Sequence, residues 1–221
     1  KTEGRSEKVW VENAIACVLL GSIHESNPKS AGIRVGSLLG YKENSKVDFV
    51  PVHLGVQDFD KAIKYYKMAE SHSFPVLAKH SQWRIGVIHE GNKNYNEALR
   101  WYKKAAGKEP FGFGGPSLSQ TYFPNGGYSG AQYSLGKMYL KGLGVVRSRV
   151  KGISWIHQAA NAGDPDAQYT IGQYYLSGVG PRPGGILDYV SKNKFRAKEW
   201  VNKAANQGHE EAKKLLGRLD P

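Results

Sequence analysis

A stretch near the C-terminal end of the chain occurs twice in tandem, and this repetition constrains the fold more than any other feature. Residues 131–144 read AQYSLGKMYLKGLG and residues 167–180 read AQYTIGQYYLSGVG, so the second copy begins 36 positions after the first. A Trp-x-x-x-Ala-Ala segment follows each copy, beginning at Trp155 and again at Trp200. Fixed periods of this size are typical of proteins whose repeats are pairs of helices. We therefore predict a helical repeat protein.

Two earlier parts of the chain contain the same pattern in a less regular form. Residues 85–89 (IGVIH) correspond to residues 135–139 (LGKMY), and residues 98–106 supply the second helix of that pair. Residues 20–25 and 61–69 indicate a still earlier pair. The sequence thus predicts helix pairs at about 9–72, 76–106, 128–162 and 165–207, with a capping helix at 209–219.

The full pattern reads A-x-x-x-L-G-x-x-Y-x-x-G-x-G-V and then K-A-x-x-W-Y-x-K-A-A-x-x-G. It resembles the Sel1-like repeat, a relative of the tetratricopeptide repeat, with a specific match in the last two pairs and a looser one in the first two. The resemblance covers most of the chain and leaves out inserts at about 26–57, 107–128 and 181–194. It implies an all-α, right-handed α-solenoid of about four repeats. Because such repeats contact only their neighbours, we expect residues 1–221 to form a single Sel1-like repeat domain.

Two glycines recur at one phase of the first helix of each late pair. Gly136 and Gly172 each cost about 1 kcal/mol relative to alanine in a helix interior, so their recurrence indicates that another helix passes too close for a side chain. We expect the Ala-Ala pairs that begin at Ala159 and Ala204 to lie at the same close crossing.

The turns between helices also have recognisable signals. Gly142 and Gly178 are placed to end the first helix in a left-handed conformation. Between the last two pairs, Gly163 reads as a helix stop, Asp164 as an N-cap and Pro165 as a first-turn residue.

The chain is strongly basic, with 31 Lys and Arg against 19 Asp and Glu and a formal net charge of +12. Such a charge favours an acidic protein partner, RNA or an anionic membrane surface. The cations are spread along the chain, as on the solvated outer face of a solenoid, and no RNA-binding signature with stacking aromatics is present. We therefore expect protein partners with an acidic surface, and keep nucleic acid and peripheral membrane association as alternatives.

The sequence contains no pattern typical of a catalytic, cofactor or metal site. His24 and His89 each precede a glutamate, but neither has a second histidine four positions later, as a zinc helix requires. Cys17 lies in the apolar run 14–20, which is too short to cross a bilayer, and we interpret it as a core residue. A single cysteine excludes an intramolecular disulfide, which favours the cytosol or the mitochondrial matrix and leaves a bacterial periplasm as an alternative.

Binding residues are expected where the first helices line the concave surface of the solenoid. Trp83, Tyr133 and Tyr169 occupy equivalent positions there, with Lys137 and Gln173 one helical turn beyond the two tyrosines. The aromatic row has two interpretations. It forms a groove for a peptide or partner, because Trp and Tyr dominate interface hot spots, or it packs adjacent first helices together.

The inserts are a second candidate for partner contact. Phe111, Phe113, Tyr122 and Phe123 crowd the insert at 107–128, and disordered linkers are usually poor in aromatics. This insert is therefore expected to be ordered against its own repeat or against a partner. In the insert at 26–57, residues 33–39 are a candidate short helix.

These observations predict a non-enzymatic protein–protein interaction scaffold, a subunit or assembly factor of a larger complex. Two alternatives stay open. One is a regulatory activator of a membrane enzyme, similar to the Sel1-repeat activators of fungal chitin synthase. The other is an RNA-binding solenoid, whose affinity would fall steeply with salt.

Overall fold

A computed structural model describes residues 58–71, 75–107, 127–178 and 192–219 of the chain, together with two short strands. Apart from these strands the described fold is all-α, as predicted, and none of the described helices is long and apolar enough to cross a membrane. The helices of the described residues are α3 (Phe59–Glu70), α4 (Pro75–Gly91), α5 (Tyr95–Ala106), α6 (Ser129–Lys141), α7 (Arg149–Asn161), α8 (Pro165–Ser177), α9 (Lys194–Asn206) and α10 (Glu210–Leu219).

The two strands, β1 (Ile33–Arg34) and β2 (Phe49–Val50), pair antiparallel, with Ile33 opposite Val50 and Arg34 opposite Phe49. The prediction of a short helix beginning at Ile33 was therefore wrong. Gly32 and Gly36 flank a segment rich in β-branched residues, and both features favour an extended chain over a helix.

The contacts within the chain divide it into two compact units, residues 1–101 and 102–221. In the first unit α3 packs against α4. Both helices contribute to the buried core of this pair, which consists of Ala62, Tyr66, Ala69, Leu77, Ile85 and Ile88, with Trp101 of α5 packed against it. The continuity of the two units as one repeat domain stays a prediction.

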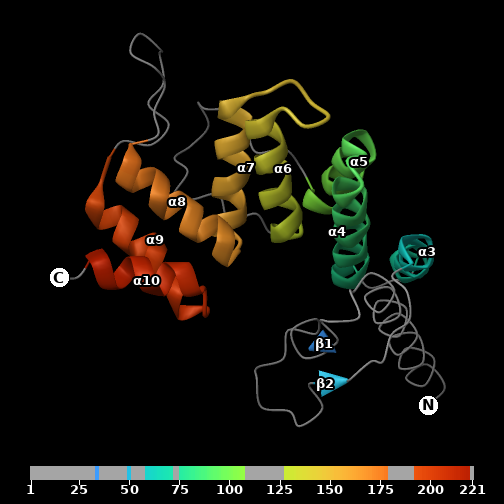
Figure 1. The fold of residues 1–221 in the computed structure, drawn as a ribbon, viewed down its shortest axis with the longest axis horizontal. Coiled ribbons are helices and arrows are strands. Elements are labelled where there is room, and N and C mark those ends of the chain that lie inside the picture. Colours follow the sequence, from blue (N-terminus) through green and yellow to red (C-terminus); the bar gives the residue numbers. More distant parts are fainter. Residues whose placement is uncertain are drawn as a thin grey trace. The chain divides into compact units, whose positions relative to one another are not determined.

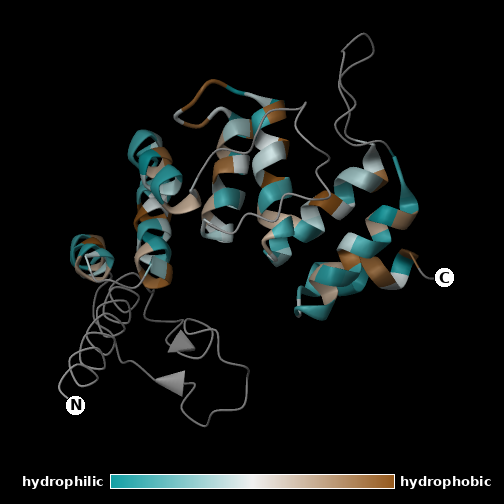
Figure 2. Ribbon diagram, turned by 180° about the vertical axis from the view of Figure 1, so that it is seen from behind, coloured by the Kyte–Doolittle hydropathy of each residue, from teal (hydrophilic) through white to brown (hydrophobic). Residues whose placement is uncertain are grey.

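In the second unit the helices pack in series, α6 on α7, α7 on α8, α8 on α9 and α9 on α10, as in an α-solenoid (Figure 1). One core cluster joins α7, α8 and α9 through Ile153, Ile156, Ile171 and Ala197, and a second joins α9 to α10 through Val201 and Ala212. Hydrophobic and hydrophilic segments alternate along these helices in Figure 2, as expected for helices with one buried face. Each helix pair therefore gains its stability from its neighbours.

The two repeated glycines lie at close helix crossings, as the sequence predicts. A Cβ on Gly136 would lie 2.9 Å from the backbone oxygen of Gly152, and one on Gly172 would lie 2.6 Å from Cγ2 of Val201 and 3.3 Å from the oxygen of Ala197. Gly152 and Ala197, one turn into α7 and α9, are thus the small residues that allow the close approach. The Ala-Ala pairs belong to the buried clusters that also contain Ala167 and Ala212, near the start of the next first helix. Their place at the glycine crossings stays a prediction.

The predicted turn signals are confirmed. Gly142 and Gly178 adopt left-handed φ angles of +73° and +65° after α6 and α8. Gly163 has a φ of +94°, and the side chain of Asp164 caps α8 by accepting a hydrogen bond from the Ala167 amide at 2.9 Å. Pro165 is the first residue of α8. These caps fix the direction in which each new helix starts.

Candidate functional site

The candidate binding residues of the second unit lie on its first helices, Tyr133 and Lys137 on α6, and Tyr169 and Gln173 on α8. We call these four residues the first-helix surface. Tyr133 is half-buried, and its hydroxyl lies 3.2 Å from Oγ1 of Thr170 on α8. The Nζ atom of Lys137 lies 4.7 Å from the centre of the Tyr133 ring, within the range of a cation–π contact. Burial raises the pKa of the Tyr133 hydroxyl, so it is a neutral hydrogen-bonding group at physiological pH.

Tyr169 makes the equivalent link to the next first helix. Its ring lies 4.6 Å from the ring of His209, which precedes α10. Nδ1 of His209 accepts a hydrogen bond from the Ala212 amide at 3.1 Å and so caps α10. The proton of the neutral imidazole is therefore on Nε2, which lies 3.3 Å from Oδ1 of Asp166 on α8. Tyr169, Asp166 and His209 together hold α8 to α10.

Both tyrosines therefore pack between adjacent first helices, which was the second of the two interpretations. The same contacts leave the rings only half-buried, while Gln173 is exposed. Packing and partner binding are compatible for such residues, because a ring held on one edge can still offer its other face. Partner binding at these positions stays a prediction.

The remaining candidates lie outside the described part of the second unit. Trp83 lies on α4 in the first unit, half-buried, with the His80 ring 5.6 Å away and the Arg84 guanidinium 5.2 Å from its ring centre. Trp83 therefore belongs to the first compact unit, and Tyr133 and Tyr169 belong to the second. The predicted row of all three aromatics stays a prediction. Phe111, Phe113, Tyr122 and Phe123 lie outside the described residues.

A partly buried carboxylate lies beside the first-helix surface. Burial raises the pKa of Asp164, whereas the hydrogen bond from the Ala167 amide and the positive charge of Lys137 act in the opposite direction. Lys137 thus interacts with an aromatic ring on its own helix and with a negative charge at the start of the next first helix. The arrangement offers fixed rings and charges for recognition.

Comparison with known families decides what kind of repeat this is. The model of the Sel1 repeat matches residues 54–73, 79–108, 129–164 and 165–209, which together are more than half of the chain. The chain belongs to the Sel1 repeat family. Among solved structures, the crystal structure of a Sel1 repeat protein from Oxalobacter formigenes is 31% identical, with a TM-score of 0.48, and the match covers 71% of this chain and 95% of that chain. No curated protein matches the chain.

Sel1 repeat proteins generally act as scaffolds for protein–protein interactions, and the family is not a catalytic one. Within the described part of this Sel1 repeat chain, no group of three or more His, Cys, Asp or Glu side chains is arranged to hold a metal ion.

Thr170, Asp166 and His209 hold the two tyrosines in place, and sequence reasoning did not identify them. A signal was present for His209, which directly precedes two glutamates at the start of a helix, where a capping acceptor is expected. Thr170 had no such signal, because its equivalent Ser134 in the preceding repeat is buried in the helix packing.

Proposed function

We propose that this Sel1 repeat protein is a subunit or assembly factor of a larger complex, and that it binds a protein partner through the first-helix surface. The observation that carries the proposal is that Tyr133 and Tyr169, at equivalent positions of two repeats, are each held in place by the next first helix. A partner lying across α6 and α8 would therefore meet the same aromatic group twice.

Rings fixed before binding favour affinity. Immobilising a free side chain at an interface costs about 0.5–1.5 kcal/mol, and Tyr133 and Tyr169 are already held by Thr170 and His209. Tyr is also among the residues that most often dominate interface energies. These features support a binding role beyond helix packing.

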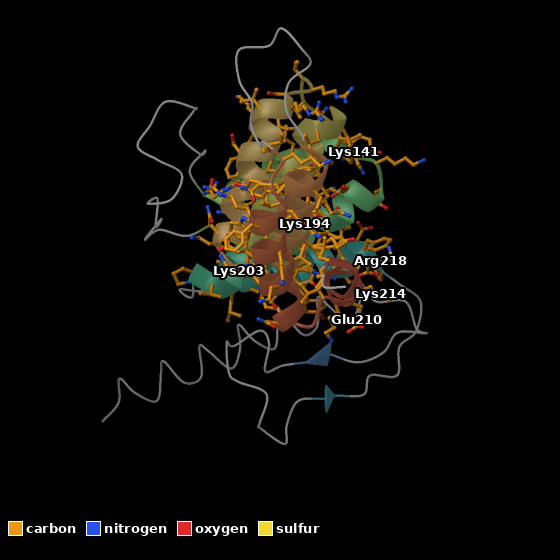
Figure 3. The ribbon with its side chains drawn as sticks, turned by 90° about the vertical axis from the view of Figure 1, so that its left-hand side faces the viewer. Lys141, Lys194, Lys203, Glu210, Lys214 and Arg218 are labelled. Carbon is orange, nitrogen blue, oxygen red and sulfur yellow. The ribbon has the colours of Figure 1, made fainter. Side chains whose placement is uncertain are left out.

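The charge of the chain favours an acidic segment as the partner. Lys137 and Gln173 follow the two tyrosines by one turn. On α10 the exposed residue Lys214 stands at the position of the tyrosines, and the exposed residue Arg218 stands at the position of Lys137 and Gln173 (Figure 3). Together with a net charge of +12, this series favours an extended acidic segment over a basic one.

Affinity capture from a native extract tests the proposal. The bait is the full chain, as wild type, as Lys137→Glu with Gln173→Arg, or as Lys103→Glu with Asn202→Arg. Both variants change the net charge equally, but Lys103 and Asn202 are exposed residues of the second helices α5 and α9. Circular dichroism and a thermal melt establish that all three are folded.

The proposal predicts a defined set of proteins that survives nuclease treatment, is retained by the second-helix variant and is reduced in the first-helix variant. Equal retention by both variants would contradict the first-helix surface. Partners lost only on nuclease treatment would instead make RNA the ligand. Capture only from detergent-solubilised membranes, with an enzyme as the captured protein, would favour the membrane-enzyme activator.

A further inference from the structure

The second unit carries opposite charges on its two edges. Two turns that lead from a second helix to the next first helix, the described residues 161–166 and 206–211, contain neither Lys nor Arg and four acidic residues, namely Asp164, Asp166, Glu210 and Glu211. The described residues that lead from a first helix to its second helix, 142–151 and 192–196, contain six Lys or Arg and no acidic residue. In Figure 1 the α6–α7 turn and the start of α9 lie on the upper side of this unit, and the other two turns on the lower side.

The basic residues repeat with the fold. Arg147-Ser148-Arg149-Val150-Lys151 precedes and begins α7, and Lys192-Asn193-Lys194-Phe195-Arg196 does the same for α9. We call the six cations of these two segments, together with the apolar residues Val146 and Phe195, the basic edge. Lys141 and Lys194 lie above Lys203 in Figure 3, on this side of the unit.

The two segments are anchored in the same way. The backbone amides of Ser148 and Asn193 donate to the carbonyl oxygens of Tyr139 and Tyr175, at 2.9 and 2.8 Å. The side chains of the same two residues cap α7 and α9. The third cation of each segment lies over the tyrosine of its own repeat, Lys151 at 5.6 Å from the Tyr139 ring and Arg196 at 5.9 Å from the Tyr175 ring. The geometry thus presents the same cationic group twice on one edge.

Contacts within the fold explain only part of this arrangement. Nε of Arg147 donates a hydrogen bond to the Leu140 carbonyl oxygen at 2.9 Å, and Nη1 of Arg196 donates one to the Tyr175 hydroxyl at 3.4 Å. A helix N-terminus carries a partial positive charge, so cations in the first turn of α7 and α9 are unfavourable by about 0.3–1 kcal/mol each. All six cations are exposed, and residues 142–151 and 192–196 contain no acidic residue, although Glu199, one turn further along α9, acts on the charge of Arg196.

Two apolar side chains project from the same edge. Val146, in the turn before α7, is 87% exposed, and Phe195, in the first turn of α9, is 73% exposed. Among the described residues of the second unit, they are the only large hydrophobic side chains that are exposed. Apolar side chains set among exposed Lys and Arg are the combination that binds an anionic lipid surface, where the cations meet headgroups and the apolar groups enter the interface.

We propose that the basic edge of the second unit docks on an anionic membrane surface. Charge complementarity and the two projecting apolar residues favour a lipid surface over RNA. RNA would be bound through stacking aromatics, and of the two residues only Phe195 could stack on a base. The proposal does not depend on the first-helix surface, which is built from other residues.

Co-sedimentation of the full chain with vesicles tests the proposal without any protein partner, so its failure would leave the proposed scaffold function untouched. The vesicles are phosphatidylcholine alone or phosphatidylcholine with about 30 mol% phosphatidylserine, because anionic lipid is the expected ligand. The chain is expected to bind only the anionic vesicles, and to be released when salt is raised from about 0.1 M to about 0.5 M.

Three variants distinguish binding through the basic edge from binding through net charge alone. Lys194→Gln with Arg196→Gln should weaken binding about 30-fold, because a cation near an anionic surface contributes about 1 kcal/mol. Phe195→Ser should weaken it about tenfold through lost apolar burial. Lys103→Gln with Lys203→Gln removes the same charge from the second helices α5 and α9 and should change binding less than about threefold. A thermal melt of each variant establishes that it is folded, because Arg196 also donates a hydrogen bond to the Tyr175 hydroxyl.

Equal weakening by the control pair would overturn the proposal, because net charge alone would then explain the binding. It would also be overturned if anionic vesicles failed to bind, or if poly(U) RNA or a poly-glutamate peptide bound through Lys194 and Arg196 while the vesicles did not. Those last two outcomes would assign the edge to nucleic acid or to an acidic protein.

Discussion

Nε2 of Gln207, just past the end of α9, donates a hydrogen bond to Oε1 of Gln168 near the start of α8, at 2.8 Å. Gln168 in turn donates through its Nε2 to the carbonyl oxygen of Ala160 at the end of α7, at 3.1 Å. One buried glutamine thus joins the ends of two second helices across a first helix. In the preceding repeat Gln132 donates to Ala106 in the same manner at 3.2 Å, but its Oε1 is buried with no hydrogen-bond partner among the described residues.

Ala162→Gln is predicted to stabilise the protein. Ala162 is exposed and is the equivalent of Gln207 in the earlier repeat, so we expect a glutamine there to reach Oε1 of Gln132 as Gln207 reaches Gln168. A net gain of about 1 kcal/mol is expected from satisfying that buried acceptor. Urea unfolding measures the gain, and Ala162→Glu is the matched control, since a glutamate has no proton to donate at neutral pH and should give no such gain.

Gly136→Ala and Gly172→Ala are predicted to destabilise the protein by about 1–3 kcal/mol each, because the added methyl group meets the facing second helix. At the equivalent position of α10, a methyl group added to Gly217 would have no described atom within 4 Å. Gly217→Ala is therefore expected to stabilise α10 by about 1 kcal/mol through helix propensity alone. Thermal melts of the three variants should show opposite signs, and a stabilised Gly172→Ala would contradict the described crossing.

The sequence predicted the all-α repeat fold, the close crossings and the helix ends, because these depend on residue types that recur at fixed spacing. It did not identify Gly152 and Ala197 as the partners in the crossings. They stand 45 positions apart, whereas the first helices repeat at 36, since the turn between α8 and α9 is longer than that between α6 and α7. The contacts of Tyr133 and Tyr169 could not be predicted from the sequence either. A half-buried tyrosine in a repeated position satisfies both the packing and the binding interpretation.

The basic edge shows the same limit. The six cations are separated along the chain, so a linear count finds them distributed. Stacking two repeats brings Arg147, Arg149 and Lys151 to the same side as Lys192, Lys194 and Arg196. This separation of charge arises because the two helices of each pair run antiparallel. It becomes visible only when the turns from first to second helices are compared with the turns from second to first helices.

Asp164→Ala and Asp164→Asn are predicted to differ in stability. Either substitution removes a carboxylate whose pKa burial raises, but asparagine still accepts the hydrogen bond from the Ala167 amide. Alanine should cost about 1 kcal/mol through loss of the helix cap, and asparagine close to nothing. Chemical unfolding at neutral pH measures both, and equal losses would show that the charge, not the cap, is what stabilises α8.

Acid is predicted to destabilise the first unit through His80. Burial, with a smaller contribution from the charge of Arg84, lowers the pKa of this histidine from 6.5 to about 4 in the folded protein. The unfolded chain therefore binds the proton more tightly, so stability is complete above pH 6.5 and is lost as the pH falls toward about 4. The full loss is about 3 kcal/mol.

His80→Gln is the matching variant, because a neutral amide cannot titrate in this range. Unfolding free energies measured from pH 7 to about pH 4 should fall more steeply for the wild type than for the variant. His157, whose pKa is also lowered by burial, contributes the same slope to both proteins and cancels in the difference. Parallel profiles would show that His80 is not buried in its neutral form.

Site-specific photocrosslinking tests the central claim most directly. A benzophenone amino acid replaces Gln173 on the first-helix surface or, as the matched control, Asn202 on α9, both of which are exposed. Irradiation in native extract is predicted to give a discrete crosslinked protein band from position 173, abolished by Lys137→Glu, and none from position 202. The same bands from both positions, or bands from position 202 alone, would contradict a scaffold that binds its partner across α6 and α8.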